Sequence, residues 1–176
     1  LRAFLLGDKG AVLATRHSDQ GASTLSGTAA FEQALADVAG PWRAARPELP
    51  VLACGMVGSQ HGWREAPYAP CPADAAALAS CTLSLGQGVH IVPGLVDDGA
   101  RPDVMRGEET QIIGALALHP ALAAEACLVL PGTHAKWARV RDARVTGFAT
   151  HMTGELYALL RQHSVLARLM PADGAA

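Results

Sequence analysis

A glycine, a threonine, a histidine and a lysine lie close together in the segment 130–137 (Leu-Pro-Gly-Thr-His-Ala-Lys-Trp). Apolar residues on both sides predict two strands joined by a tight polar loop. Backbone N–H groups near a glycine can approach a phosphate closely, and Lys136 adds a positive charge. The chain has two lysines, Lys9 and Lys136, and its other basic residues are arginines. A lysine in this loop therefore mildly suggests that an ammonium group, rather than a guanidinium group, is required there. The loop could bind an anion, although an ordinary polar hairpin fits the residues equally well.

A second polar loop, 55–65, follows a short apolar segment that predicts a buried strand at 50–54. Ligands of open α/β sheets lie at the carboxyl ends of the strands. The loop offers hydroxyl, amide, indole and carboxylate groups, which suit a polyhydroxylated small molecule. A surface turn with a half-buried tryptophan is the simpler alternative. The spacing matches neither the hydrolase nor the dinucleotide fingerprint. The candidate ligand residues are Ser59, Gln60, Trp63, Glu65 and Tyr68.

A third candidate, Arg-Gly-Glu-Glu at 106–109, lies at the start of a predicted helix. Carboxylates in a first helical turn usually interact with the helix dipole. That explains one glutamate well and two adjacent ones less well, because adjacent side chains point in different directions. One of them, Glu108 or Glu109, could face a cleft as a general base. No Walker A pattern occurs in the chain, so a phosphate site needs another scaffold.

The elements that carry these loops alternate between strands and helices. Hydrophobic patterning predicts two β-meanders, each followed by a helix, and therefore two related α/β halves with a cleft between them. We expect strands at 1–6, 11–16, 50–54, 89–92, 127–130, 137–140 and 144–149. We expect helices from Thr28, which can cap its helix, at 74–85 (helix or loop), from 104 or 107 to 118, and at 155–170. Gly40-Pro41 is expected to end or kink the first helix.

Composition excludes several classes of protein. Half of the 176 residues are hydrophobic, 17% are charged and the formal net charge is −2. A sizeable core is therefore expected, without electrostatic attraction to nucleic acid or to a membrane surface. No apolar stretch approaches the roughly 20 residues of a membrane span. The four scattered cysteines contain no Cys-x-x-Cys pair, so we expect reduced thiols in a cytoplasmic protein, without a zinc site.

Four segments, 55–68, 104–111, 130–137 and 152–160, resemble in this order the 2-dehydro-3-deoxygalactonokinase family. The resemblance implies a carbohydrate kinase of the actin and sugar-kinase superfamily, whose α/β domains are ribonuclease-H-like, with a mixed sheet, helices and ATP between the domains. It also implies ATP- and Mg²⁺-dependent phosphorylation of 2-dehydro-3-deoxy-D-galactonate at its 6-hydroxyl, in galactonate catabolism. Sugar acid and ATP are then the partners, and a homodimer stays open.

The resemblance also suggests residue roles. Alignment on Gly107 selects Glu108 as the base and leaves Glu109 open. The 59–68 loop would line the sugar-acid pocket, with Arg64 or Arg106 pairing with the substrate carboxylate. Gly132, Thr133, His134 and Lys136 would contact nucleotide phosphate.

The chain covers part of the family pattern. We expect a first domain at 1–124, without its first strand but with a connecting helix at 107–118, and the start of a second domain at 125–176. The first phosphate hairpin and the adenosine-binding part lie outside this pattern, so no Mg²⁺ or adenine ligand is assigned. Two alternatives remain. One is a truncated, non-catalytic and weakly stable chain that binds sugar acid or nucleotide weakly; the other is a phosphatase or another ATPase of the superfamily.

Overall fold

The computed structural model describes residues 1–169, which form an α/β fold of short strands and four α-helices. The helices are α1 (Thr28–Ala45), α2 (Ala75–Ser80), α3 (Glu108–Leu118) and α4 (Thr153–His163). The strands are β1 (Arg2–Leu6), β2 (Val12–His17), β3 (Val51–Ala53), β4 (Tyr68–Pro70), β5 (Leu83–Gly86), β6 (Val89–Ile91), β7 (Gly94–Asp97), β8 (Asp103–Met105), β9 (Glu125–Leu130), β10 (Ala135–Arg141) and β11 (Arg144–His151). The expected α/β class with mixed strand directions is confirmed.

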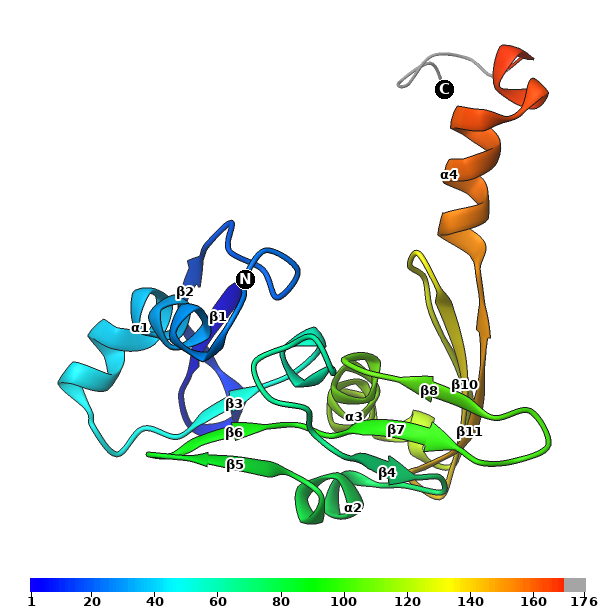
Figure 1. The fold of residues 1–176 in the computed structure, drawn as a ribbon. Helices are drawn as coiled ribbons and strands as arrows, with labels where there is room; N and C mark the ends of the chain where they lie inside the picture. Colours follow the sequence, from blue (N-terminus) through cyan, green and yellow to red (C-terminus); the bar gives the residue numbers. More distant parts are fainter. Residues whose placement is uncertain (170–176) are drawn as a thin grey trace.

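The strands form four small sheets (Figure 1). Two of the sheets, β3-β6-β5 and β4-β7-β8, each combine one parallel pair with one antiparallel pair. The other two, the β1-β2 hairpin and the β9-β10-β11 meander, are antiparallel. The parallel pairs bring the carboxyl ends of β3 and β6, and of β4 and β7, to common edges, where loops of different origin can meet.

The main hydrophobic core joins the central sheet β4-β7-β8, helices α2 and α3, and the β9-β10-β11 meander. A backbone bridge between Ala73 and Val145 connects the meander to the segment after β4. The buried members of this core are Ala69, Ala73, Leu78, Leu95, Met105, Ile112, Leu116, Ala138, Val140, Val145 and Phe148. The core therefore contains residues from both sides of the boundary expected at 124/125, and the division into 1–124 and 125–176 stays a prediction.

Helix α1 differs from expectation at both of its ends. Gly27, at φ +77°, is the cap residue and Thr28 is the first helical residue, without a side-chain capping bond. The helix runs through Pro41 to Ala45. Of the two effects expected of Gly40-Pro41, an end or a kink, the end is wrong and the kink stays a prediction. Proline cannot donate to the carbonyl four residues earlier. In its place, Arg16 Nη1 donates to the Asp37 carbonyl at 3.4 Å, which supplies that acceptor with a partner.

The segment 74–85 also differs from the expected helix. Helix α2 ends at Ser80, and the residues after it form β5, which pairs with β6. Asp74 caps α2 by accepting a hydrogen bond from the Ala77 N–H at 2.9 Å. Strands β4, β7 and β8 were not predicted at all.

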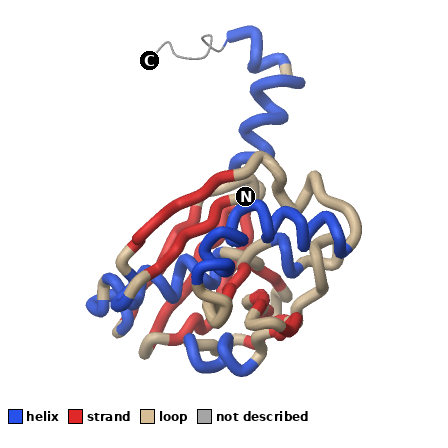
Figure 2. The backbone as a smooth tube through the Cα atoms, turned by 90° about the vertical axis from the view of Figure 1, so that its left-hand side faces the viewer, coloured by secondary structure: helices blue, strands red, loops and turns tan. Residues whose placement is uncertain are grey.

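Helix α4 projects away from the rest of the chain in two views (Figures 1 and 2). It ends at His163 and a 3₁₀ turn follows at Val165–Leu169, so the predicted helix was too long, and its last residue, Met170, lies outside the described residues. No side chain of α4 is buried, and Leu156, Leu159 and Leu160 are about half exposed. Among residues 1–169, no helix has the length and apolar character needed to cross a membrane.

Candidate functional site

A tight turn between β8 and α3 holds the two candidate carboxylates. Gly107, at φ +109°, is the cap residue of α3, in a backbone region that favours glycine. A Cβ at this position would lie 3.2 Å from the Gly55 Cα. The turn is therefore packed against Gly55, the first residue of the 55–65 loop. The two polar loops meet at this contact.

Glu109 lies at the centre of this turn. It has no exposed surface, its Oε2 accepts a hydrogen bond from the Gly107 N–H at 2.6 Å, and its Oε1 accepts one from Thr110 Oγ1 at 3.1 Å. Burial raises the pKa of its carboxyl above the ordinary value of 4.5, and the nearby charge of Glu108 adds to the rise. The hydrogen bonds oppose this rise in the pKa because they stabilise the ionised form.

Glu108 is more accessible and has a free oxygen. Its Oε2 accepts a hydrogen bond from the Arg106 N–H at 3.1 Å, while its Oε1 accepts none within residues 1–169. Adjacent residues on a helix point in different directions, so Glu109 faces the interior while Glu108 stays partly exposed. The two carboxylates thus point in different directions, and the assignment of Glu108 or Glu109 as the base stays a prediction.

Cys54 adjoins the same turn at the end of β3. Burial of its sulfur raises the pKa of the thiol above 9.0; a hydrogen bond with Thr110 opposes the rise and the charge of Glu109 adds to it. The thiol is therefore kept protonated, and its surroundings do not resemble those of a nucleophilic cysteine.

Arg106 and Tyr68 lie in direct contact. The Arg106 guanidinium carbon is 4.2 Å from the centre of the Tyr68 ring, and Nη2 donates to the Ala66 carbonyl at 2.9 Å. Nε and Nη1 are buried and have no hydrogen-bond partner in the described chain. A Cβ on Gly58 would lie 3.0 Å from Nη1, so the glycine leaves room for the guanidinium. Two unpaired donor nitrogens make this a candidate site for a carboxylate.

The other residues of the 59–65 loop lie in different surroundings. Ser59 Oγ donates to the Met56 carbonyl at 2.8 Å and so closes its own turn, and the side chains of Gln60 and Glu65 are exposed. Trp63 stacks on Phe31 of α1, with ring centres 6.2 Å apart. Trp63 lines two adjacent cavities between α1 and the β5–β6 hairpin, of about 410 and 270 Å³. Neither cavity is lined by Tyr68, Arg106, Glu108 or Glu109.

The loop before β10 packs against the start of α4. The Gly154 and Glu155 N–H groups donate to the carbonyls of Gly132 and Thr133, at 3.2 and 3.1 Å. His134 Nε2 is hydrogen-bonded to Glu155 Oε2 at 2.5 Å, and both side chains are partly exposed. The loop residues themselves are exposed, as an anion-binding loop requires.

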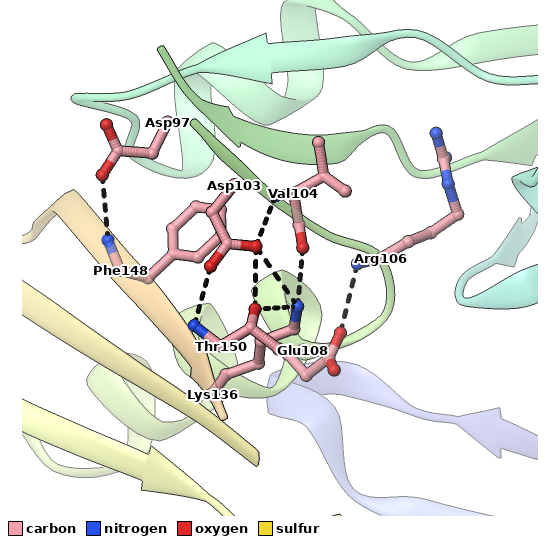
Figure 3. Close-up of polar contacts among 8 residues, drawn as sticks. All are labelled: Asp97, Asp103, Val104, Arg106, Glu108, Lys136, Phe148 and Thr150. Atoms are coloured by element: carbon pink, nitrogen blue, oxygen red, sulfur yellow. Dashed lines mark hydrogen bonds and ion pairs between the residues drawn. The ribbon is translucent and has the colours of Figure 1, made fainter. Parts of the chain in front are cut away.

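Lys136, by contrast, is buried, with 8% of its surface exposed. Its Nζ donates to the Val104 carbonyl and to Thr150 Oγ1, both at 2.6 Å, and lies 3.8 Å from Asp103 Oδ1 (Figure 3). Among residues 1–169, Glu109 and Lys136 are the two buried polar or charged side chains, and the sequence singled out both. Sequence reasoning missed Asp103 and Thr150. Thr150 is the cross-strand neighbour of Lys136 in the β10–β11 hairpin, whereas Asp103 reaches Lys136 through the packing of β8 beside β11.

The described residues include no group of three or more histidine, cysteine, aspartate or glutamate side chains that could hold a metal ion. All four cysteines are free thiols.

Comparison with known proteins gives consistent matches. The family model described as 2-keto-3-deoxy-galactonokinase matches residues 1–176. Proteins named as 2-dehydro-3-deoxygalactonokinases from Rhizobium meliloti and Escherichia coli are each 41% identical over 173 residues, which cover 94% and 97% of this chain. A crystal structure of a Sinorhizobium meliloti protein with the same name is 40% identical, with a TM-score of 0.84 over 95% of this chain. The chain spans 54% and 56% of the lengths of the two curated relatives.

Proposed function

The chain belongs to the 2-keto-3-deoxy-galactonokinase family, and on that premise we propose that it carries the sugar-acid site and one phosphate loop of an ATP-dependent kinase. The reaction is phosphorylation of 2-dehydro-3-deoxy-D-galactonate at its 6-hydroxyl, in galactonate catabolism. The observation that carries the proposal is the 105–109 turn, which presents a partly exposed carboxylate close in sequence to an arginine with two unpaired donor nitrogens. A sugar acid offers partners for both, a hydroxyl group and a carboxylate.

Arg106 and Tyr68 form the proposed end of the pocket that binds the substrate carboxylate. The buried Nε and Nη1 of Arg106 lack partners, and an arginine fork matches a carboxylate in geometry and charge. Ser59, Gln60, Trp63 and Glu65 remain proposed substrate residues on the adjoining loop. Among them Trp63 has the weakest support, because it faces α1.

Glu108 is the proposed base, with Glu109 as the alternative. A base must reach the hydroxyl whose proton it accepts, and Oε1 of Glu108 is free while both oxygens of Glu109 are engaged inside the chain. Glu109 then positions the turn by holding the Gly107 N–H. Such a base contributes roughly 10²–10⁴ in rate.

The exposed loop residues Gly132, Thr133 and His134 are the proposed contacts of the transferring phosphoryl group. Catalysis of phosphoryl transfer rests mainly on positioning and charge stabilisation. Mg²⁺ is expected to enter with ATP, and no residue of this chain is assigned to it. The proposal includes the ribonuclease-H-like fold of the actin and sugar-kinase superfamily, the division at 124/125 and a cytoplasmic location.

The test is ADP release by this chain with ATP, Mg²⁺ and 2-dehydro-3-deoxy-D-galactonate. Glu108→Gln should lower kcat by roughly 10²–10⁴, and Glu109→Gln should lower it less. Arg106→Met should raise KM for the sugar acid, whereas Arg64→Met, which changes the exposed alternative arginine of the 55–65 loop, should leave this KM unchanged. Near-normal turnover by Glu108→Gln would remove Glu108 from the base role.

A non-catalytic chain that binds sugar acid or nucleotide weakly is the second candidate, and one observation favours it. Helix α4 buries no side chain and leaves an apolar stripe in solvent, so the surroundings of the phosphate loop are open. A substrate-induced thermal shift without ADP release would support this candidate, while ADP release would support the kinase.

A further inference from the structure

The Lys136 ammonium makes two hydrogen bonds and one ion pair inside the chain. An ammonium group has three N–H donors. Lys136 gives two of them to the Val104 carbonyl and Thr150 Oγ1, and Asp103 Oδ1 lies 3.8 Å away (Figure 3). With 8% of the residue exposed, the ammonium is directed to these internal contacts rather than presented to an incoming phosphate.

The partners of Lys136 form a joint between two sheets. Strand β8 pairs with β7 on one side and has no backbone ladder with β11 on the other. Side chains join β8 to β11 instead, because Asp103 accepts hydrogen bonds from the Thr150 N–H at 2.7 Å and from Thr150 Oγ1 at 2.8 Å. Asp97, the last residue of β7, likewise reaches β11 and accepts from the Phe148 N–H at 3.2 Å. Lys136, from β10, adds a cation to this joint (Figure 3).

We propose that Lys136 is a positioning residue that sets the spacing between the Glu108–Glu109 turn and the 132–134 loop. Val104, whose carbonyl it holds, lies two residues before Arg106 on the strand that leads into the turn. Lys136 itself lies two residues after His134, at the start of the strand that leaves the loop. A buried, charge-assisted contact between these two positions ties the candidate base to the candidate phosphate loop. This inference rests on the proposed function for its consequence in catalysis, but its geometry can be tested without it.

The first test is hydrogen exchange in the whole chain. Lys136→Met removes the ammonium and keeps a long apolar side chain. Arg141→Met is the matched control, because it removes a cation from the same strand whose ion pair with Glu125 is largely exposed. We expect exchange in 103–109 to accelerate roughly tenfold or more in Lys136→Met, with β3 and β6 unchanged and Arg141→Met unaffected. Unchanged exchange in 103–109, or a uniform acceleration over the whole chain, would overturn the inference.

Thr150→Val supplies a second variant in case Lys136→Met does not fold. It removes the hydroxyl partner of Lys136 at nearly constant volume and leaves both charges of the joint in place. A smaller acceleration confined to the same segment is expected. Exchange in 103–109 equal to that of the parent chain would count against the joint.

Kinetics separate positioning from phosphate binding. A misplaced base costs turnover, so kcat of Lys136→Met should fall about 100-fold while KM for ATP changes less than about threefold. A KM for ATP raised about tenfold or more at unchanged kcat would identify Lys136 as a phosphate ligand and refute the positioning role. If the parent chain releases no ADP, the proposed function fails, and hydrogen exchange still decides whether Lys136 holds the turn.

Discussion

Replacement of Glu109 by glutamine should remove a pH-dependent loss of stability. Glu109 is fully buried and its carboxyl pKa is raised by that burial. A group with a raised pKa in the folded state contributes its full stability below the unfolded pKa, here 4.5. That contribution is lost as pH rises through the folded pKa, because ionisation then favours the unfolded chain. Each unit of the rise corresponds to about 1.4 kcal/mol of lost stability above the folded pKa.

Glutamine is neutral at every pH and keeps the contacts of this site. Its carbonyl can accept from the Gly107 N–H and its amide can donate to Thr110 Oγ1, so Glu109→Gln should lie within about 1 kcal/mol of the parent near the unfolded pKa. As pH rises, the parent should lose stability relative to the variant by the amount given above. The variant should therefore be the more stable protein at mildly alkaline pH.

Urea unfolding at several pH values between about 5 and 8 measures this difference. Thr110→Val should act in the opposite direction. The Thr110 hydrogen bond stabilises the ionised carboxylate of Glu109 and lowers its pKa, so removal of this bond should raise the pKa further. The parent should then lose stability less steeply than Thr110→Val and more steeply than Glu109→Gln. A stability difference between the parent and Glu109→Gln that stays constant over this range would refute the reasoning.

Four further predictions concern separate parts of the chain. Gly107→Ala should cost about 1–3 kcal/mol in urea unfolding, since φ is +109°, and a loss below about 0.5 kcal/mol would contradict this. Cys71, whose pKa burial raises to about 11, should be alkylated far more slowly at pH about 8 than a free thiol, as mass spectrometry can show. Pro41→Ala should raise the free energy of unfolding by about 1–2 kcal/mol and so raise Tm, because alanine restores a helical N–H. A lower Tm would argue against this. Leu160→Lys, on exposed α4, should change the free energy of unfolding by less than about 0.5 kcal/mol and reduce self-association in sedimentation. A much larger loss of stability would mean that Leu160 is packed against another part of the protein.

The candidate site was predictable where its parts are neighbours in sequence. Glu108 and Glu109 follow a glycine at a helix start, and this local pattern is enough to predict the turn and the first residues of the helix. The contact of Arg106 with Tyr68 joins two predicted residues, although their direct contact was not foreseen. Of the partners of Lys136, Thr150 faces it across the β10–β11 hairpin, just beyond the predicted strands 137–140 and 144–149, and Asp103 joins them only when two sheets pack.

The fold was predictable where periodicity extends over several turns or alternations. Helices α1 and α3 and the β9-β10-β11 meander satisfy that condition. Strands β4 and β8, of three residues each, are too short to show an alternation, and prolines at 67, 70 and 102 suggest loops around them. Trp63 was expected to face a ligand, and its stacking on Phe31 depends on where α1 packs.

The carboxylates of Asp97 and Asp103 also decide where the meander can grow. They occupy the outward N–H groups of Phe148 and Thr150, so a strand that approaches β11 from outside finds these donors already used. Strand β9, in the described part of the chain, pairs only with β10 and keeps its other edge open. Lateral addition of a further strand is thus directional: it is hindered at β11 and permitted at β9, whether that strand comes from the same polypeptide or from a neighbouring molecule.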